Sequence, residues 1–377
     1  MKIVLAIDSM KGCLSSADAN RAAADGVRSV FPDADIVQIP VSDGGEGFID
    51  AFHAAIGGTL QEVAVRDPMM RYITAKYLLR GQEAVIEIAQ ACGLTLLSEE
   101  ERNPLVATSY GAGQLIADAV RKGAKRIIVG LGGSATSDAG IGMLRALIDV
   151  FAKRGQFDDI AELHDVQFTI ASDVKNPLCG AQGAAYIFAP QKGASAEMVE
   201  RLDTRARKFA EVSAKHFGYD CSDDEGAGAA GGLGYAFLQY LHATFRPGIE
   251  VLLEAARFSD VVRDADLVIT GEGSADSQTL MGKLPVGVLQ QSGDVPVCLI
   301  AGCVRDREAL LAAGFSDVRS INPEGFSLHE AMRPEVARKH ISDTIRNLLA
   351  RDLIKKPAEQ PEQFDQEDGL FKFEKKV

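Results

Sequence analysis

Several stretches of the chain place glycines beside carboxylates, hydroxyls or lysines, just after apolar runs that predict strands. The longest is RIIVGLGGSATSDAGIG at residues 126–142. In it a β-branched run leads into Gly132, Gly133 and Ser134. An apolar helical pattern resumes at Ile141. Glycines let the backbone approach a ligand closely, and a helix N-terminus offers unpaired N–H donors. The stretch predicts an anion site, although alone it fits a tight strand-to-helix turn equally well.

The same mixture of residue types follows several other predicted strands. The residues are Asp8, Ser9 and Lys11, then Asp43, Gly44, Gly45 and Glu46, then Asp173, Lys192, Glu272, Asp276 and Lys283. Open parallel sheets bind ligands at the carboxyl ends of their strands. Phosphoryl transfer uses these residue types, because amides and lysines hold phosphate oxygens while carboxylates hold Mg²⁺ or accept a hydroxyl proton. The recurrence predicts a phosphate-handling α/β protein and leaves the substrate open.

Taken singly, each of these residues has a plainer structural interpretation. Asp8 and Asp43 are suited to cap the helices that follow them. A glycine pair is more often a turn than a ligand cradle, and a single lysine such as Lys192 is most often solvated. The sequence also lacks a GxxxxGK[ST] loop, an HRD catalytic loop and a GxGxxG motif after the first strand. These absences argue against a Walker-type NTPase, a protein kinase and a standard dinucleotide site.

The composition is that of an α/β globular protein, and it argues against several kinds of partner. The chain has 377 residues, enough for two domains, with 46% hydrophobic and 25% charged residues. A net charge of −13 without a basic block disfavours nucleic acid and anionic membranes. No apolar run reaches the roughly 20 residues of a membrane span. The six cysteines form no CxxC pair and the six histidines share no ligand spacing, so a reducing cytoplasm fits best and zinc is disfavoured.

The order of predicted elements indicates a parallel sheet interrupted by a second unit. Strands are predicted at 2–7 and 35–40, each followed by a helix, which is typical of a parallel sheet. Short, closely spaced strands follow from residue 57, and a further short strand is predicted later at the run YIFA (186–189). A buried-strand pattern returns at 267–270. We therefore expect an α/β fold with its ligand cleft between two domains. The expected parts are a parallel-sheet domain (1–62 and 262–353), an inserted second α/β domain (63–261) and a charged tail (354–377).

In their order along the chain, these motifs resemble the bacterial type-I glycerate kinase family. The matching stretches are the N-terminal AIDSMKGCLSS, PVSDGGEG (40–47), NPLVATSYGAGQLI (103–116), GLGGSATSDAG (130–140), SDVKNPLCG (172–180), FAPQKGAS (188–195), GAGAAGGLG (226–234), LVITGEG (267–273) and GKLPVGV (282–288). The resemblance covers about residues 1–335. It implies a Rossmann-like domain from both chain ends, an inserted α/β domain, and ATP-dependent phosphorylation of D-glycerate at the 2-hydroxyl to give 2-phosphoglycerate.

The resemblance also implies roles for the strand-end residues. Asp43 and Asp173 are the acidic centre, one as general base and the other as the Mg²⁺ contact, with the assignment left open. Lys11 and Lys192 neutralise the transferring phosphoryl group. The other implied substrate or phosphate contacts are Asp8, Ser9, Gly44, Gly45, Gly132, Gly133, Ser134, Glu272, Asp276 and Lys283. The implied cofactors are ATP and Mg²⁺, the implied partners are small-molecule substrates, and a homo-oligomer is left open.

One position departs from the family pattern. The family usually reads TGEGR where this chain has Ser274 in the place of the arginine. A missing guanidinium removes a bidentate partner for a carboxylate or phosphate. The change leaves open a kinase for another small hydroxy acid, or a non-catalytic nucleotide- or metabolite-binding relative. A nicotinamide dehydrogenase is disfavoured because its fingerprint motif is absent.

Overall fold

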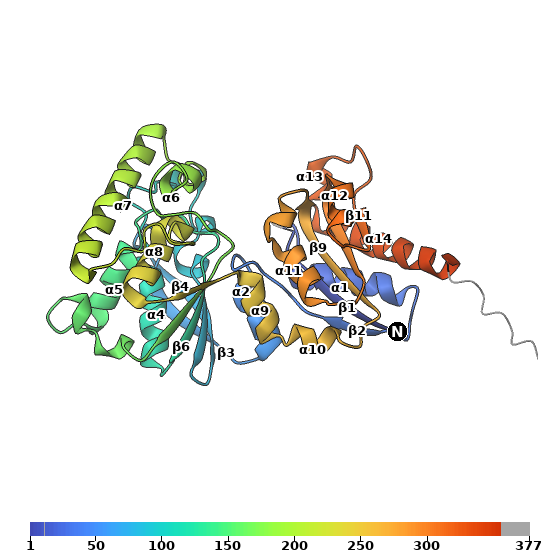
Figure 1. Cartoon of the computed structure of the whole chain (residues 1–377), viewed down its shortest axis with the longest axis horizontal. Helices are drawn as coiled ribbons and strands as arrows, with labels where there is room; N and C mark the ends of the chain where they lie inside the picture. The colour runs from blue at the N-terminus through green and yellow to red at the C-terminus, as the bar shows by residue number, and fades with distance from the viewer. Residues whose placement is uncertain (11, 356–377) are drawn as a thin grey trace, which may run out of the picture.

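The computed structural model describes residues 1–10 and 12–355, which form two β-sheets lying beside each other with helices packed around them (Figure 1). The first sheet contains β1 (Lys2–Ile7), β2 (Asp35–Gln38), β9 (Leu267–Ala275), β10 (Val297–Val304) and β11 (Asp317–Ser320). Its strand order is β11-β10-β9-β1-β2 and all neighbours are parallel. The expected Rossmann-like sheet built from both chain ends is therefore confirmed.

The second sheet is mixed. Its strands are β3 (Thr59–Arg66), β4 (Tyr72–Arg80), β5 (Glu83–Glu87), β6 (Arg126–Gly130), β7 (Gln167–Ala171) and β8 (Thr244–Arg246), in that spatial order. The pairs β3–β4 and β4–β5 are antiparallel, whereas β5 to β8 are parallel. Short connections permit only antiparallel pairing, and the parallel strands need helical crossovers. The closely spaced strands predicted from residue 57 thus open an inserted α/β unit.

Helices cover the faces of both sheets. They are α1 (Ser16–Arg28), α2 (Phe48–Ile56), α3 (Ala89–Cys92), α4 (Tyr110–Arg121), α5 (Ile141–Phe151), α6 (Ala184–Phe188), α7 (Ala196–Phe217), α8 (Ala229–Leu241), α9 (Gly248–Ala255), α10 (Phe258–Val262), α11 (Leu284–Gln291), α12 (Arg307–Ala312), α13 (Leu328–Ala331) and α14 (Pro334–Lys355). Ser15 caps α1, because its Oγ accepts the Asp18 N–H at 3.1 Å. No helix in the described part of the chain is both long and apolar enough to cross a membrane.

One hydrophobic core joins the two sheets. It contains Val4 of β1 and Leu299 of β10 together with Val85 of β5, and it includes buried residues of α2 and α9. Figure 1 shows α2 and α9 between the two halves of the molecule. The shared core places the strand ends of both sheets at the same junction.

The structure differs from the sequence prediction at YIFA. Residues 184–188 form helix α6, not a strand, and Ala185 and Ala189 pack with Val199 and Leu202 of the α7 region. A short apolar run has no period long enough to separate a strand from a buried helical turn.

The structure bears on two of the expected boundaries, the one between the two domains at residue 62 and the start of the tail at residue 354. Residue 62 falls inside β3, which pairs with β4 along its whole length. We therefore propose that the chain passes from the first domain to the inserted one near Gly57 and Gly58. Of the expected tail, residues 356–377 lie outside the described residues, and the two residues before them end α14.

Candidate active site

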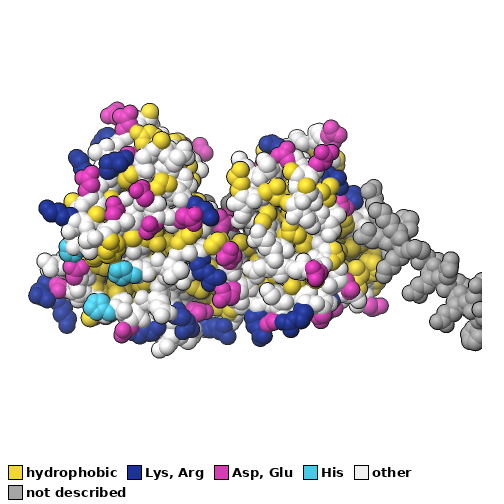
Figure 2. All heavy atoms as spheres, in the orientation of Figure 1, with side chains coloured by type: hydrophobic (Ala, Val, Ile, Leu, Met, Phe, Trp, Pro, Cys, Tyr) yellow, Lys and Arg dark blue, Asp and Glu magenta, His cyan; other side chains and the backbone are white. Residues whose placement is uncertain are grey.

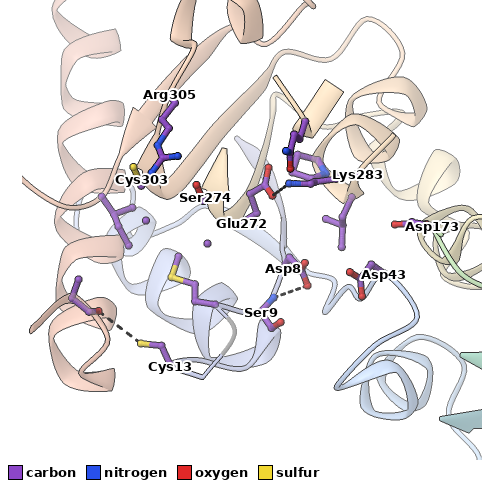
Figure 3. Close-up of a pocket in the computed structure, with 18 of the residues that line it drawn as sticks. Asp8, Ser9, Cys13, Asp43, Asp173, Glu272, Ser274, Lys283, Cys303 and Arg305 are labelled. Atoms are coloured by element: carbon purple, nitrogen blue, oxygen red, sulfur yellow. Dashed lines mark hydrogen bonds and ion pairs between the residues drawn. The ribbon is translucent and has the colours of Figure 1, made fainter. Parts of the chain in front are cut away.

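A cavity of about 820 Å³ lies at the carboxyl ends of β1, β9 and β10 and extends to the end of β7. In the space-filling view the surface is hollowed between the two halves of the molecule (Figure 2). Six of the residues selected from the sequence line the cavity (Figure 3). They are Asp8, Ser9, Asp43, Asp173, Glu272 and Lys283. The prediction that strand-end loops from distant parts of the chain share one site therefore holds for these six.

Neighbouring strands of the first sheet bring Asp8 and Glu272 together. Ile7 pairs with Gly271 in the β1–β9 ladder, and the Asp8 N–H donates to the Gly271 carbonyl at 2.9 Å. Glu272 is largely buried, and its Oε1 accepts a hydrogen bond from Thr279 Oγ1 at 2.6 Å. Its Oε2 lies 3.9 Å from Lys283 Nζ. A carboxylate and an ammonium are thus held side by side in the cavity wall.

Backbone amides position Asp43 and Asp173. Asp43 Oδ1 accepts the N–H of Gly45 at 3.0 Å, and Asp173 Oδ1 accepts the N–H of Gly248 at 3.1 Å. Gly248 begins α9, and a Cβ there would be 2.3 Å from the Asp43 carbonyl oxygen. Only glycine lets α9 begin this close to both acidic segments. Sequence reasoning missed Gly248, and the Pro-Gly pair before an apolar helical pattern was the available signal.

The predicted glycine loops pack against each other instead of lining the cavity. The Gly132 N–H donates to the Gly44 carbonyl at 2.9 Å, and a Cβ on Gly132 would be 2.3 Å from the Gly45 Cα. Gly44 has φ +96°, a conformation that favours glycine. Among the described lining residues of the cavity, Gly44, Gly45, Gly132, Gly133 and Ser134 are absent. In the structure this loop contact joins the acidic segment after β2 to the end of β6.

Backbone N–H groups at the start of α5 donate hydrogen bonds to the carboxylate of Asp138. Asp138 Oδ2 accepts the N–H groups of Gly142 at 3.1 Å and Ser109 at 2.8 Å, and its Oδ1 accepts the N–H of Gly140 at 3.1 Å. The sequence predicted an external anion at this helix start. In the structure Asp138 already supplies a negative charge at this helix start, and an anion held by Gly132, Gly133 and Ser134 stays a prediction.

Lys192 and Ser134 meet inside the inserted domain. Lys192 Nζ donates to Ser134 Oγ at 2.8 Å and to the Thr136 carbonyl at 2.6 Å. Lys192 is 3% exposed, and burial lowers its pKa to about 8. It does not line the cavity that holds Asp43 and Asp173. Lys11 lies outside the described residues.

Around β9 and β10 the structure adds Gln278 and Arg305, which the sequence reasoning missed, to the cavity lining. Asp276 Oδ1 accepts the Gln278 N–H at 2.9 Å and shapes a turn, and Gln278 rather than Asp276 lines the cavity. Ser274 lines the cavity too, paired in the sheet with Cys303. Arg305 lies beside them (Figure 3). Arg305 directly follows β10, so it lies at a strand end as the selected residues do.

The carboxylates suit Mg²⁺ as a ligand set. Proteins that act on phosphates commonly bind Mg²⁺ through one or two carboxylates, and the substrate phosphates complete its coordination. Asp43 and Asp173 in one cavity fit this pattern. Within residues 1–10 and 12–355, no group of three or more His, Cys, Asp or Glu side chains is arranged to hold a metal ion by itself.

The two α/β sheets and the carboxylate- and lysine-lined cavity at their junction are typical of phosphotransferases that act on small molecules. The chain belongs to the glycerate kinase family, whose model matches residues 3–157 and 152–352. The resemblance stated from the motifs is thereby confirmed.

Named relatives agree with the family assignment. The chain is 42% identical to a glycerate kinase from Bacillus subtilis (strain 168), and the alignment covers 93% of this chain and 97% of that protein. It is 39% identical to glycerate 2-kinase from Escherichia coli (strain K12), with the same coverage. A crystal structure from Salmonella typhimurium LT2, named as a candidate glycerate kinase 2, superposes with a TM-score of 0.78 at 38% identity. That superposition covers 94% of this chain and 98% of the other, which confirms the fold over nearly the whole length.

Proposed function

We propose that this chain phosphorylates D-glycerate at the 2-hydroxyl, with ATP as donor, to give 2-phosphoglycerate. One observation carries the proposal: Asp43, which follows β2 of the first sheet, and Asp173, which follows β7 of the second, line one cavity with Lys283. Family membership and the name of the Escherichia coli relative support the choice of substrate and hydroxyl.

The two aspartates divide the chemistry in this proposal. One carboxylate accepts the proton of the attacking hydroxyl, which increases the nucleophilicity of that oxygen. The other contacts Mg²⁺, which when bound neutralises charge between the phosphates. Both Asp43 and Asp173 accept a backbone N–H, so their orientations are fixed before substrate binds.

Cationic groups hold the phosphates. Lys283 is the described lysine of the cavity, and Glu272 at 3.9 Å orients its ammonium. Asp8, Ser9 and Glu272 border the nucleotide and its metal. We keep Lys11 as a phosphoryl-neutralising group on the family match alone.

The remaining predicted residues hold the segments around the acidic centre in place. We propose that Lys192 serves the reaction by fixing the segment from Ser134 to Asp138, because its ammonium bonds that segment and is buried. Gly44, Gly45, Gly132 and Gly133 hold the loops next to the acidic centre, and Asp276 shapes the turn before Lys283. All six cysteines are free thiols, which agrees with our proposal that the protein works in the reducing cytoplasm.

A product assay tests the reaction. Purified protein is incubated with ATP, Mg²⁺ and D-glycerate, and the phosphorylated product is identified by ³¹P NMR. A 2-phosphoglycerate signal is the expected result. A 3-phosphoglycerate signal would overturn the choice of hydroxyl and keep the kinase. Intact ATP with folded protein would overturn the proposal, and a panel of other small hydroxy acids would then test the consequence of Ser274.

A further inference from the structure

The cavity changes in character along its length. Figure 3 shows Asp43 and Asp173 at one end and Cys303 and Arg305 at the other. Helix α13 borders the end away from the aspartates, because the carbonyl of Ala331 lies 3.9 Å from Cys13 Sγ in the cavity wall. The apolar lining residues include Ile321, Leu328, Ala331 and Met332, together with Met281. An acidic end therefore shares one continuous space with an end that carries Arg305 and several apolar side chains.

Two apolar side chains of this lining are exposed to an unusual degree. Met281 is 80% exposed and Leu328 is 75% exposed, although each lies at the edge of a concave site. Burying a large apolar side chain that is otherwise exposed to water is favourable. Both side chains therefore offer binding free energy to a ligand that covers them. Met332, also partly exposed, lines the same cavity, and its N–H donates to the Leu328 carbonyl at 2.9 Å.

Met281 also lies close in the chain to the cation that the proposed function assigns to phosphate. It ends the short helical turn Thr279–Met281, and Lys283 follows two residues later as the N-cap of α11. A ligand with an apolar, planar part against Met281 would direct an attached phosphate chain toward Lys283 and the aspartates. A nucleoside triphosphate has this distribution of apolar and anionic groups.

We propose that the purine base of the nucleotide packs between Met281 and Leu328, with its phosphates extending toward Lys283. This assignment rests on the proposed function and adds the orientation of the donor in the cavity. The volume of about 820 Å³ lies within the usual range for sites of drug-sized ligands. The acceptor then approaches from the side of Asp173, which the second sheet contributes.

The test measures separately how much the base and the phosphates contribute to binding. Binding of ADP and of inorganic tripolyphosphate, each with Mg²⁺, is measured by calorimetry for the full chain and for Met281→Asn, Leu328→Asn and the double variant. Both side chains are exposed, so the variants should fold. The matched control is Val212→Asn on α7, where Val212 is 68% exposed and lies outside the cavity lining.

We expect each single variant to weaken ADP binding about tenfold. Tripolyphosphate binding should stay within twofold, and Val212→Asn should change neither. ADP binding that stays within twofold in the double variant would overturn the orientation, as would equal weakening of tripolyphosphate. The ADP titration contains no acceptor, so its outcome is independent of turnover. Wild-type protein that binds ADP through this pair but makes no phosphoglycerate would overturn the proposed function and keep the orientation.

Discussion

The backbone N–H of Gly248 donates to Asp173 Oδ1 at 3.1 Å, at the first residue of α9. The same glycine faces Asp43, whose carbonyl oxygen would be 2.3 Å from a Cβ at this position. One residue without a side chain thus sets the positions of two acidic segments that follow strands of different sheets. This arrangement makes Gly248 a positioning residue for the proposed acidic centre.

Gly248→Ala is expected to lower kcat by 10- to 100-fold. The added methyl must displace the Asp43 backbone or α9, and displacements of about 1 Å at a reacting group can cost 10²-fold. KM for ATP should change less, because Met281 and Lys283 lie on other elements. Steady-state kinetics measure both constants. Glu250→Ala, an exposed position on the same helix, is the control, and a Gly248→Ala enzyme with wild-type kcat would contradict the positioning role.

Asp43→Asn and Asp173→Asn test the acidic centre itself. Asparagine keeps the side-chain size and a hydrogen-bond acceptor for the backbone N–H, but it removes the negative charge and the basic oxygen. General-base catalysis contributes roughly 10²–10⁴ in rate, so we expect kcat to fall by at least 10²-fold in each variant. Asp33→Asn, in an exposed turn, should be neutral. Losses of less than tenfold in both variants, with Tm unchanged, would remove these residues from the chemistry.

Local signals were sufficient to predict the strands at both chain ends. The β-branched run of residues 267–270 and the cap at Ser15 depend only on nearby residues, so the sequence contains their cause. The rule that ligands bind at strand ends then selected Asp8, Asp43 and Asp173 without knowledge of how the loops meet.

Contacts between segments that are distant in the chain could not be predicted from local sequence signals. The partners of Asp138 include the N–H of Ser109, and the partner of Lys192 is Ser134, each supplied by another element. The bonds from Gly140 and Gly142 to Asp138 are local, and an aspartate just before a helix is a recognised capping signal, but the bond from Ser109, 29 residues earlier, could not be predicted from the sequence. Helix α6 was missed for a related reason, because its burial against α7 decides its conformation more than its residue types do.

The Lys192→Met substitution tests whether Lys192 positions the segment that contains Ser134 or takes part in phosphoryl transfer. The substitution keeps most of the volume but leaves Ser134 Oγ and the Thr136 carbonyl without the ammonium that bonds them. Unpaired buried polar groups cost about 1–3 kcal/mol each, offset in part because the buried charge is also removed. We expect a lower Tm and a kcat within tenfold of wild type, measured well below Tm. A kcat reduced by 10²-fold or more, with an unchanged Tm, would instead place the ammonium at the transferring phosphoryl group.

Glu87 makes stability depend on pH. It ends β5, is 2% exposed and accepts the Ile49 N–H at 3.4 Å through Oε2. Burial raises its pKa from 4.5 to about 7. Between these values the folded protein holds a proton that the unfolded chain releases, so the free energy of unfolding falls as pH rises toward 7 and remains lower above it. The loss from pH 5 to pH 8 is about 2 kcal/mol.

Glu87→Gln removes this titration and keeps the side-chain size. Its Tm relative to wild type should therefore increase by a few degrees from pH 5 to pH 8, as measured by calorimetry at both pH values. Glu62→Gln on β3 is the matched control, since that side chain is exposed and its variant should follow wild type at both pH values. A Tm difference for Glu87→Gln that is constant, or that shrinks as pH rises, would show that the carboxyl at this strand end is not held neutral by burial.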